Sequence, residues 1–438
     1  MSPIGRDSAS VELPGGPWPE LRMPSRLTFD HFSRFNRYAQ GMITLDLQTS
    51  EHHVSDGNAL LAYAARHTLL PQLQRLLIRT GSINSEELDW IAALFSPSIQ
   101  EIRFIPSPGT ESPLTSDRTL YFLESISRKC PRLEVLEIHP FDDWLDWNDE
   151  PDGKNVPDVD PRLQNRFWEP LARLENLRSF YTNPYLAQLQ DMATFSSFPT
   201  LELLDLSKGG PFTEIIRLDD TCDLFPSLRH LALRNLKVAH HEAFWDRAPF
   251  LHTLESFHLV IGPQDHNSEL YEWFPPGMNV DTFTRLSRLT IHIQAFHPEA
   301  LVVIGLQELA CIALLPLRFL CILGVFLDGD TDDQGERWSK VLARWWPDME
   351  ELHWSAQSAN LLDLSHFAVL DKLQHLTFNL KMTRAPNIMP PVLNRSIVFK
   401  RLETSGSQRI GKRGIGFLRD LWPNVSFVYP SGHAVDHR

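Results

Sequence analysis

Histidine and arginine recur at equivalent places in a series of similar short segments of this chain. Each segment reads apolar-x-x-apolar-x-apolar, as in Leu228 to Leu233 (LRHLAL), with polar residues between or just after the apolar ones. If the segments are strands, these polar side chains share one face, because alternate residues of a strand point to opposite sides. Imidazole and guanidinium groups there could receive an acidic or aromatic segment of a partner, in a pH-sensitive way. The candidates are Tyr181, His230, Arg234, His258, Arg288, His292, His353 and His375.

The alternative for these polar positions is chance combined with polar filler on an exposed sheet. Six of the chain's 18 histidines fall at such positions, and the same rule places Glu137 and His139 on that face. The segments that start at Leu228, Leu254 and Leu286 are consecutive, so their strands would lie about 4.8 Å apart. The hypothesis is therefore a central groove rich in histidine and arginine.

Two other motifs approach known ligand sites and lack a required residue. Gly406 to Arg413 (GSQRIGKR) nearly matches the phosphate-binding loop, but Arg413 replaces the hydroxyl that would hold Mg²⁺, and we expect no strong strand before it. Asp328 to Gly335 resembles the start of a calcium loop, but Asp333 stands where glycine is required. We therefore predict no catalytic residue, no cofactor and no metal site, and keep a nucleotide-dependent enzyme as a remote alternative.

The recurring segment defines a repeat, and a proline often comes two residues before it, as at Pro131 and Pro226. The first apolar residues stand about 29 residues apart on average, at the upper edge of the 20–29 residues of leucine-rich repeats. The segments start at residues 42, 73, 99, 133, 177, 201, 228, 254, 286, 317, 349, 373 and, more loosely, 402 and 425.

Helices are expected between the strands. Ser116 to Lys129 has apolar residues on one helical face, with Ser116 as N-cap, and Pro131 prevents continuation. Residues 336–345 end in the same way before Pro347. A strand–helix unit repeated in one direction puts parallel strands on one side and helices on the other. We therefore predict an α/β leucine-rich-repeat solenoid with strands on the concave face and helices and irregular loops on the convex face.

Composition narrows the class of partner and the compartment. The chain has 438 residues, 42% hydrophobic and 22% charged, with a formal net charge of −14, which disfavours nucleic acid as a partner. Its four cysteines show no close spacing, so a reducing intracellular compartment, cytoplasmic or nuclear, is expected. The N-terminus does not read as a secretory signal, and no apolar stretch is long enough to predict membrane association.

The domain organisation follows the repeat. The predicted units are a disordered Pro/Gly-rich N-terminus (1–26), an aromatic capping segment (27–41), the solenoid (42–430) and a disordered tail (431–438). An acidic insertion at 139–161 carries eight Asp or Glu residues and one Lys. We interpret it as a solvated, disordered loop; the alternative is a docking site for a basic partner, anchored by Phe141, Trp144 and Trp147.

The segment from Cys130 to Ile138 (CPRLEVLEI) resembles the repeat of F-box leucine-rich-repeat proteins. Over about residues 27–430 the layout is similar to the F-box-like proteins of fungi, in which an aromatic-rich segment precedes the first repeat. The resemblance implies a non-catalytic protein-recognition module like the substrate-binding part of a ubiquitin-ligase receptor, with a protein partner on the concave face and a cullin-ligase adaptor bound through an F-box.

The N-terminal segment departs from that family pattern. Five prolines in residues 1–26 exclude stable helices there, so the helical F-box is expected to be absent. Either the gene model has lost it, or the protein is a repeat-only structural adaptor without a ligase link.

Overall fold

The computed structural model describes residues 29–48, 58–80, 83, 85–106, 114–140, 161–182, 195, 198–207, 225–234, 252–261, 283–293, 301–328, 335–381, 398–406 and 410–429. Fourteen strands form one parallel sheet in chain order. They are β1 (Thr44–Gln48), β2 (Arg75–Thr80), β3 (Glu101–Pro106), β4 (Val135–Glu137), β5 (Ser179–Tyr181), β6 (Leu203–Leu206), β7 (His230–Arg234), β8 (Ser256–Ile261), β9 (Arg288–Ile293), β11 (Phe319–Leu323), β13 (Glu351–Ala359), β14 (His375–Leu380), β15 (Arg401–Thr404) and β16 (Ser426–Val428).

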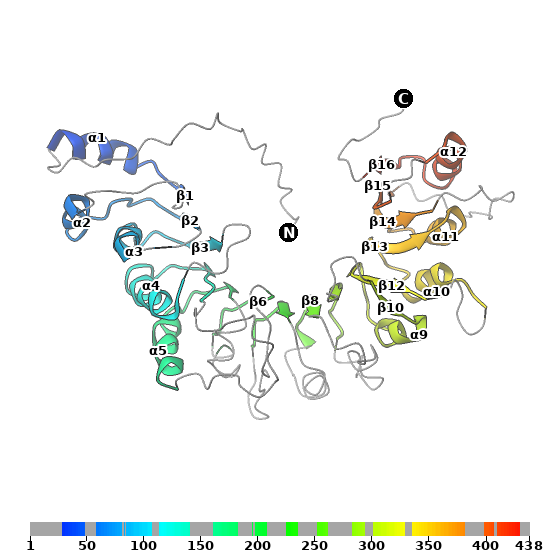
Figure 1. The fold of residues 1–438 in the computed structure, drawn as a ribbon, viewed down its shortest axis with the longest axis horizontal. Helices are drawn as coiled ribbons and strands as arrows, with labels where there is room; N and C mark the ends of the chain where they lie inside the picture. Colours follow the sequence, from blue (N-terminus) through cyan, green and yellow to red (C-terminus); the bar gives the residue numbers. More distant parts are fainter. Residues whose placement is uncertain are drawn as a thin grey trace.

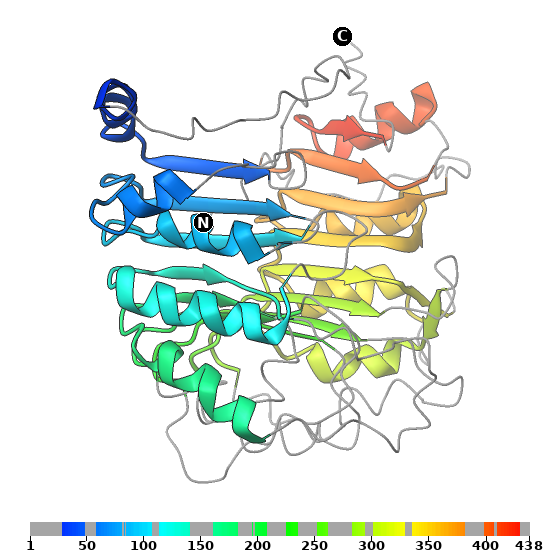
Figure 2. The ribbon, with the colours of Figure 1, turned by 60° about the vertical axis from the view of Figure 1, so that its left-hand side comes forward.

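Helices cover the outer side of this sheet. Figure 1 shows a curved arch with the strands on its inner side and the helices on its outer side, and Figure 2 shows the strands running in one direction. The helices are α1 (Phe29–Ala39), α2 (Asn58–Ala64), α3 (Ser85–Ala93), α4 (Ser116–Lys129), α5 (Pro161–Ala172), α9 (Leu306–Leu309), α10 (Trp338–Trp345), α11 (Leu361–Phe367) and α12 (Lys412–Leu421), with a 3-10 turn at Ala310–Ile312. This confirms the α/β leucine-rich-repeat solenoid.

Two columns of buried apolar side chains explain why the recurring segment builds this sheet. The first apolar residue of each segment packs just before its strand, and the second packs within it, on the helix side. The first column is Leu73, Ile99, Leu133, Leu177, Leu201, Leu228, Leu254, Leu286, Leu317, Met349, Leu373 and Phe399, each at most 1% exposed. The predicted start at 402 is therefore wrong by three residues, because Leu402 belongs to the second column, in register with Leu376.

The turn that leads into each strand links neighbouring repeats. Proline is the first residue of this turn at several repeats, such as Pro199 and Pro226. The next residue donates to the preceding repeat: Thr200 Oγ1 to the carbonyl of Leu177 (2.9 Å) and Ser227 Oγ to that of Pro199 (2.7 Å). Each repeat therefore fixes its neighbour through a hydrogen bond as well as through the apolar columns.

Charged side chains alternate along the edge of the sheet where the strands begin. The residue directly before the strand is, in successive repeats, Glu134, Arg178, Glu202, Arg229 and Glu255. Arg178 pairs with Glu202 (3.6 Å), and Arg229 pairs with Glu255 (3.2 Å). We call these five residues the alternating rim. Each of these pairs is exposed and contributes at most about 1 kcal/mol to stability.

A second, two-stranded sheet lies outside the main one. Strands β10 (Val302–Ile304) and β12 (Val325–Leu327) pair in parallel. Gly324 joins β11 to β12 with a φ of +74°, and a Cβ there would lie 1.9 Å from the carbonyl oxygen of Ile293. Only glycine tolerates both conditions. The buried Trp354 of β13 donates from Nε1 to the carbonyl of Val325 (2.8 Å), which ties the small sheet to the large one.

The helices expected from sequence are present, with shifted ends. α4 spans Ser116–Lys129, but its N-cap is Thr115, and Ser116 is buried inside the first turn. α10 covers Trp338–Trp345 of the expected second helix. In α1, Phe35 packs against the core, whereas Tyr38 is exposed. Of these two aromatic residues, Phe35 is therefore the one that can cap the solenoid.

Parts of the predicted organisation lie outside the described residues. Residues 1–28, 141–160 and 430–438 are among these, so the two termini and the acidic insertion with its aromatic residues stay predictions, as do the domain limits. Within the described part of the chain, every helix is too short or too polar to cross a membrane.

Candidate binding site on the concave face

Two rows of side chains line the concave face, because the strands pair in register. The first row is Thr44, Arg75, Glu101, Val135, Ser179, Leu203, His230, Ser256, Arg288, Phe319, Glu351, His375, Arg401 and Ser426. The second row, two residues further along each strand, is Asp46, Leu77, Arg103, Glu137, Tyr181, Asp205, Ala232, His258, Thr290, Cys321, His353, Thr377, Glu403 and Val428.

A cluster of ion pairs lies on the concave face across β3, β4 and β5. Arg103 contacts Glu101 through Nε (2.6 Å) and Glu137 through a terminal nitrogen (3.3 Å). Its guanidinium also lies over the ring of Tyr181, 4.9 Å from the centroid. The imidazole of His139 is 3.2 Å from Glu137. Glu137 and His139, predicted to face a partner, are buried, at 1% and 4% exposure, and they contact each other and, through Glu137, Arg103.

The predicted central groove lies on β7 to β9. His230 stands in the first row, and burial lowers its pKa, an effect that Glu255 opposes. His258 stands in the second row, and burial also lowers its pKa, with Asp205 opposing and His292 adding to the shift. Burial therefore makes both histidines harder to protonate than a free imidazole. Arg234 ends β7, in register with Val260.

A continuous stack of side chains crosses four neighbouring strands of the C-terminal half. The Arg288 guanidinium lies 4.1 Å from the centroid of the Phe319 ring. That ring is 5.4 Å from His353, and His353 is 4.4 Å from His375 in an edge-to-face arrangement. We call these four residues the stacked run. Arg288, His353 and His375 were predicted from the sequence, whereas Phe319 was not, although it also stands two residues after the first apolar residue of its segment, Leu317.

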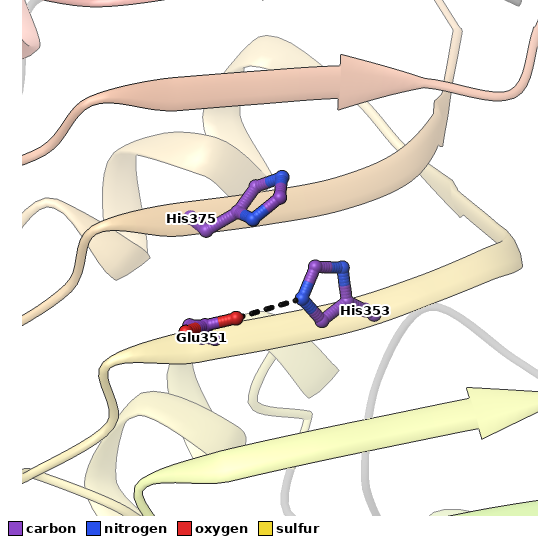
Figure 3. A group of neighbouring side chains, drawn as sticks. All are labelled: Glu351, His353 and His375. Carbon is purple, nitrogen blue, oxygen red and sulfur yellow. Dashed lines mark hydrogen bonds and ion pairs between the residues drawn. The ribbon is translucent and has the colours of Figure 1, made fainter. Parts of the chain in front are cut away.

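The last two members of the stacked run form a polar cluster with Glu351. Figure 3 shows Glu351 and His353 on one strand and His375 on the next, all on the same side of the sheet. His353 Nε2 is 3.3 Å from Glu351 Oε2, and its Nδ1 is 2.9 Å from Thr377 Oγ1. His375 Nε2 is 3.5 Å from Glu403 Oε1. The side chains of His353 and His375 keep 20% and 18% of their surface exposed.

A serine, a histidine and an aspartate also meet between α10 and α11. Ser339 Oγ donates to Asp363 Oδ1 (3.1 Å) and lies 2.8 Å from His366 Nδ1. Asp363 further accepts from the backbone N–H of Asn360 (3.0 Å) and pairs with Arg337 (3.1 Å). A nucleophilic serine gives its proton to histidine, and the aspartate orients that histidine. Here the buried serine donates to the aspartate instead, so the group stabilises the start of α11.

The loop that resembles a phosphate-binding motif connects β15 to α12. We expected no strong strand before it, and the strand that precedes it is the four-residue β15, which ends at Thr404. Gly406 serves packing, since a Cβ there would come within 2.6 Å of Asn379 Oδ1. α12 begins at Lys412, directly after its N-cap Gly411. Arg413 still occupies the place of the Mg²⁺-binding hydroxyl, and residues 407–409 lie outside the described part.

The sheet and its repeat define the class of protein, a leucine-rich-repeat solenoid. No family model matches the chain, and no curated protein matches its sequence. An internalin (inlF) from Listeria monocytogenes is similar at 10% identity and a TM-score of 0.36, covering 86% of this chain and 89% of its own. A chain from the Rad7 and Elc1 complex of yeast is similar at 14% identity and a TM-score of 0.37, covering 77% and 71%. At these TM-scores neither similarity bears on function.

Proposed function

We propose that this protein is a non-catalytic recognition module that holds a protein partner on its concave face. The proposal includes a role like that of the substrate-binding part of F-box ubiquitin-ligase receptors. The observation that carries it is the stacked run, in which one exposed and three partly exposed side chains keep fixed mutual positions on the sheet. Side chains that are ordered before binding lose little entropy when a partner arrives.

The chemistry of this surface favours an acidic or aromatic partner segment. Arg288 is exposed and carries a permanent positive charge next to the ring of Phe319. An aromatic side chain can extend the stack, and a carboxylate can pair with the guanidinium. Burial disfavours the protonated form of His230 and His258. A bound carboxylate would raise their pKa, so binding would strengthen as the pH falls.

The experiment is purification of the tagged chain, residues 1–438, from its native cells, with quantitative mass spectrometry of retained proteins. The test variant carries His230→Ala, Arg234→Ala, His258→Ala and Arg288→Ala. The control variant removes exposed arginines that stand directly before strands, at the edge of the sheet where the strands begin. Its substitutions are Arg178→Ala, Arg229→Ala and Arg318→Ala. We expect a stoichiometric partner with the wild type and the control, and at least a tenfold loss with the test variant. Equal retention by both variants contradicts the proposal.

The same purification separates the two forms of the proposal. Stoichiometric cullin and F-box adaptor among the retained proteins support the ligase-receptor role. A stoichiometric partner without either of them supports the alternative, a repeat-only structural adaptor that has no ligase link.

A further inference from the structure

The cluster of Glu351, His353 and His375 brings together three groups that bind metals. Glu351 and His353 are two residues apart on β13, so both point to the concave side. His375 pairs in register with Glu351 on the adjacent strand. One donor atom from each of the three residues lies within 4.8 Å of the others. Among the described residues, this is the one group of three or more histidine, cysteine or acidic side chains that meets this condition.

The spacing of the donors suits a small tetrahedral ion. Zinc bonds to nitrogen and oxygen of about 2.0–2.1 Å place two donors of a tetrahedral site roughly 3.3–3.4 Å apart. His353 Nε2 and Glu351 Oε2 already stand at 3.3 Å. The donor from His375 lies within 4.8 Å of the other two, so it has to approach them by at most about 1.4 Å, through a rotation of its partly exposed imidazole.

The hydrogen bonds around His353 leave a lone pair that faces a carboxylate. Thr377 Oγ1 donates to Glu403 Oε2 (3.3 Å), so the same oxygen accepts from the Nδ1–H of His353 (2.9 Å). A neutral His353 then presents the lone pair of Nε2 to Glu351. Two acceptors at 3.3 Å repel each other unless a proton or a metal ion lies between them, so the contact leaves a place that a metal ion can take. Thr377 thus orients His353 in the way that outer hydrogen-bond partners orient metal-binding histidines.

We propose that Glu351, His353 and His375 bind one divalent transition-metal ion of the zinc type on the concave face. Two imidazole nitrogens and one carboxylate oxygen form the donor set that zinc and its neighbours prefer, whereas Ca²⁺ and Mg²⁺ need more oxygen donors. Because Glu351 retains 39% of its side-chain surface, the ion can enter from solvent. The fourth coordination position is left to water.

The test is a calorimetric titration of the purified, chelator-treated full chain with ZnCl₂, at pH 7.5. We expect one Zn²⁺ per chain in the micromolar range and no heat from MgCl₂. His375→Gln and Glu351→Gln should each weaken binding at least tenfold. The control His292→Gln, which alters a histidine of β9 outside the cluster, should change it less than twofold. Absence of one-to-one binding at 100 µM zinc, or an equal loss in the control, overturns the proposal.

A second pair of variants guards against loss of folding. Thr377→Val keeps all three donors and removes the oxygen that orients His353, so zinc affinity should fall about tenfold. Thr377→Ser restores that oxygen and should restore affinity to within about threefold. Circular dichroism and the urea midpoint of the metal-free variants should match the wild type. Unchanged affinity in Thr377→Val would show that the oriented lone pair of His353 plays no part, which also contradicts the proposed site.

Discussion

Two strands far apart on the arch carry nearly the same pattern on the concave face. β3 presents Glu101 in the first row and Arg103 in the second, and β13 presents Glu351 and His353 at the same two places. In both strands the cationic or imidazole group turns back to its own glutamate, at 2.6 Å for Arg103 and 3.3 Å for His353. The difference is one residue type, and it changes what the surface can do.

Arg103 is a permanent cation, so the N-terminal cluster is internally balanced. Arg103 pairs with both Glu101 and Glu137 and lies over Tyr181, while Arg75 adds a second cation beside Glu101 (3.4 Å). The cluster therefore offers a partner few unpaired charges. His353 is a weak base, so its cluster lacks a fixed positive charge of its own. The same backbone geometry thus gives a closed ion pair in one half and, in the other, the three side chains that we propose as a metal site.

The largest effect is expected from removing the fixed cation. Arg103→Met leaves the carboxylate of Glu137, which is 2% exposed, without its guanidinium. We expect a loss of about 3 kcal/mol in the free energy of unfolding, the low end for a broken buried pair because Arg103 is itself partly exposed. Urea unfolding measures it. Arg79→Met is the matched control, since its pair with Asp46 is exposed on both sides and should cost under about 1 kcal/mol. Equal costs would remove the distinction between the two kinds of pair.

The next effect comes from making the two clusters alike. His353→Arg places a guanidinium beside Glu351 in the position that Arg103 has beside Glu101. Stability without metal should change little, while the stabilisation by zinc should disappear. For a free zinc concentration of 100 times Kd that stabilisation is about 2.7 kcal/mol in the wild type. Thermal unfolding with and without ZnCl₂ measures both quantities, and a zinc-dependent rise in Tm of this variant would contradict the comparison.

A smaller effect tests the cation–aromatic contacts that both regions share. Tyr181→Leu removes the ring under Arg103, and Phe319→Leu removes the ring under Arg288. Each should lower the free energy of unfolding by about 1 kcal/mol. Tyr181→Phe keeps the ring and should cost less than Tyr181→Leu. If Phe319→Leu leaves the free energy of unfolding unchanged while Tyr181→Leu lowers it, the contact between Arg288 and Phe319 does not stabilise the fold.

The smallest effect concerns pH and the strands between the two clusters. Burial holds the pKa of His258 below its usual value, so the unfolded chain binds a proton more readily than the folded one. This contribution to stability is complete above about pH 6.5 and is lost as the pH falls from there through the folded pKa. In His258→Gln, the decrease in stability between pH 7 and pH 5 should be smaller than in the wild type. Urea midpoints across that range test this, and parallel curves would contradict it.

The sheet could be predicted from the sequence because the residues of each repeat contain the complete apolar pattern of its strand. The spacing of Leu133 and Leu136, for example, predicts a strand without reference to any other segment. The cluster of Glu351, His353 and His375 could not be predicted in the same way, since it joins residues of two repeats. The signal was nevertheless present, because Glu351 and His375 each stand two residues after the first apolar residue, Met349 and Leu373. Aligning the segments would have placed them opposite each other.

Other features depended on contacts that no local pattern announces. The pair β10 and β12 lies beside the repeat and not within it, and its join at Gly324 depends on the carbonyl of Ile293, about thirty residues earlier. The burial of Glu137 depends on Arg103 from the preceding strand. A strand pattern tells which side a residue faces, but the length and charge of its neighbours decide whether solvent still reaches it.

The alternating rim sets a rule for how this solenoid can change length. Loss of the single repeat that contains Arg178 would bring Glu134 beside Glu202, and loss of the next repeat would bring Arg178 beside Arg229. Loss of two consecutive repeats would restore opposite charges at the new junction. Between Glu134 and Glu255, the gain or loss of an even number of repeats therefore keeps opposite charges side by side, whereas an odd number brings like charges together. Electrostatics can in this way favour an even change in the number of repeats.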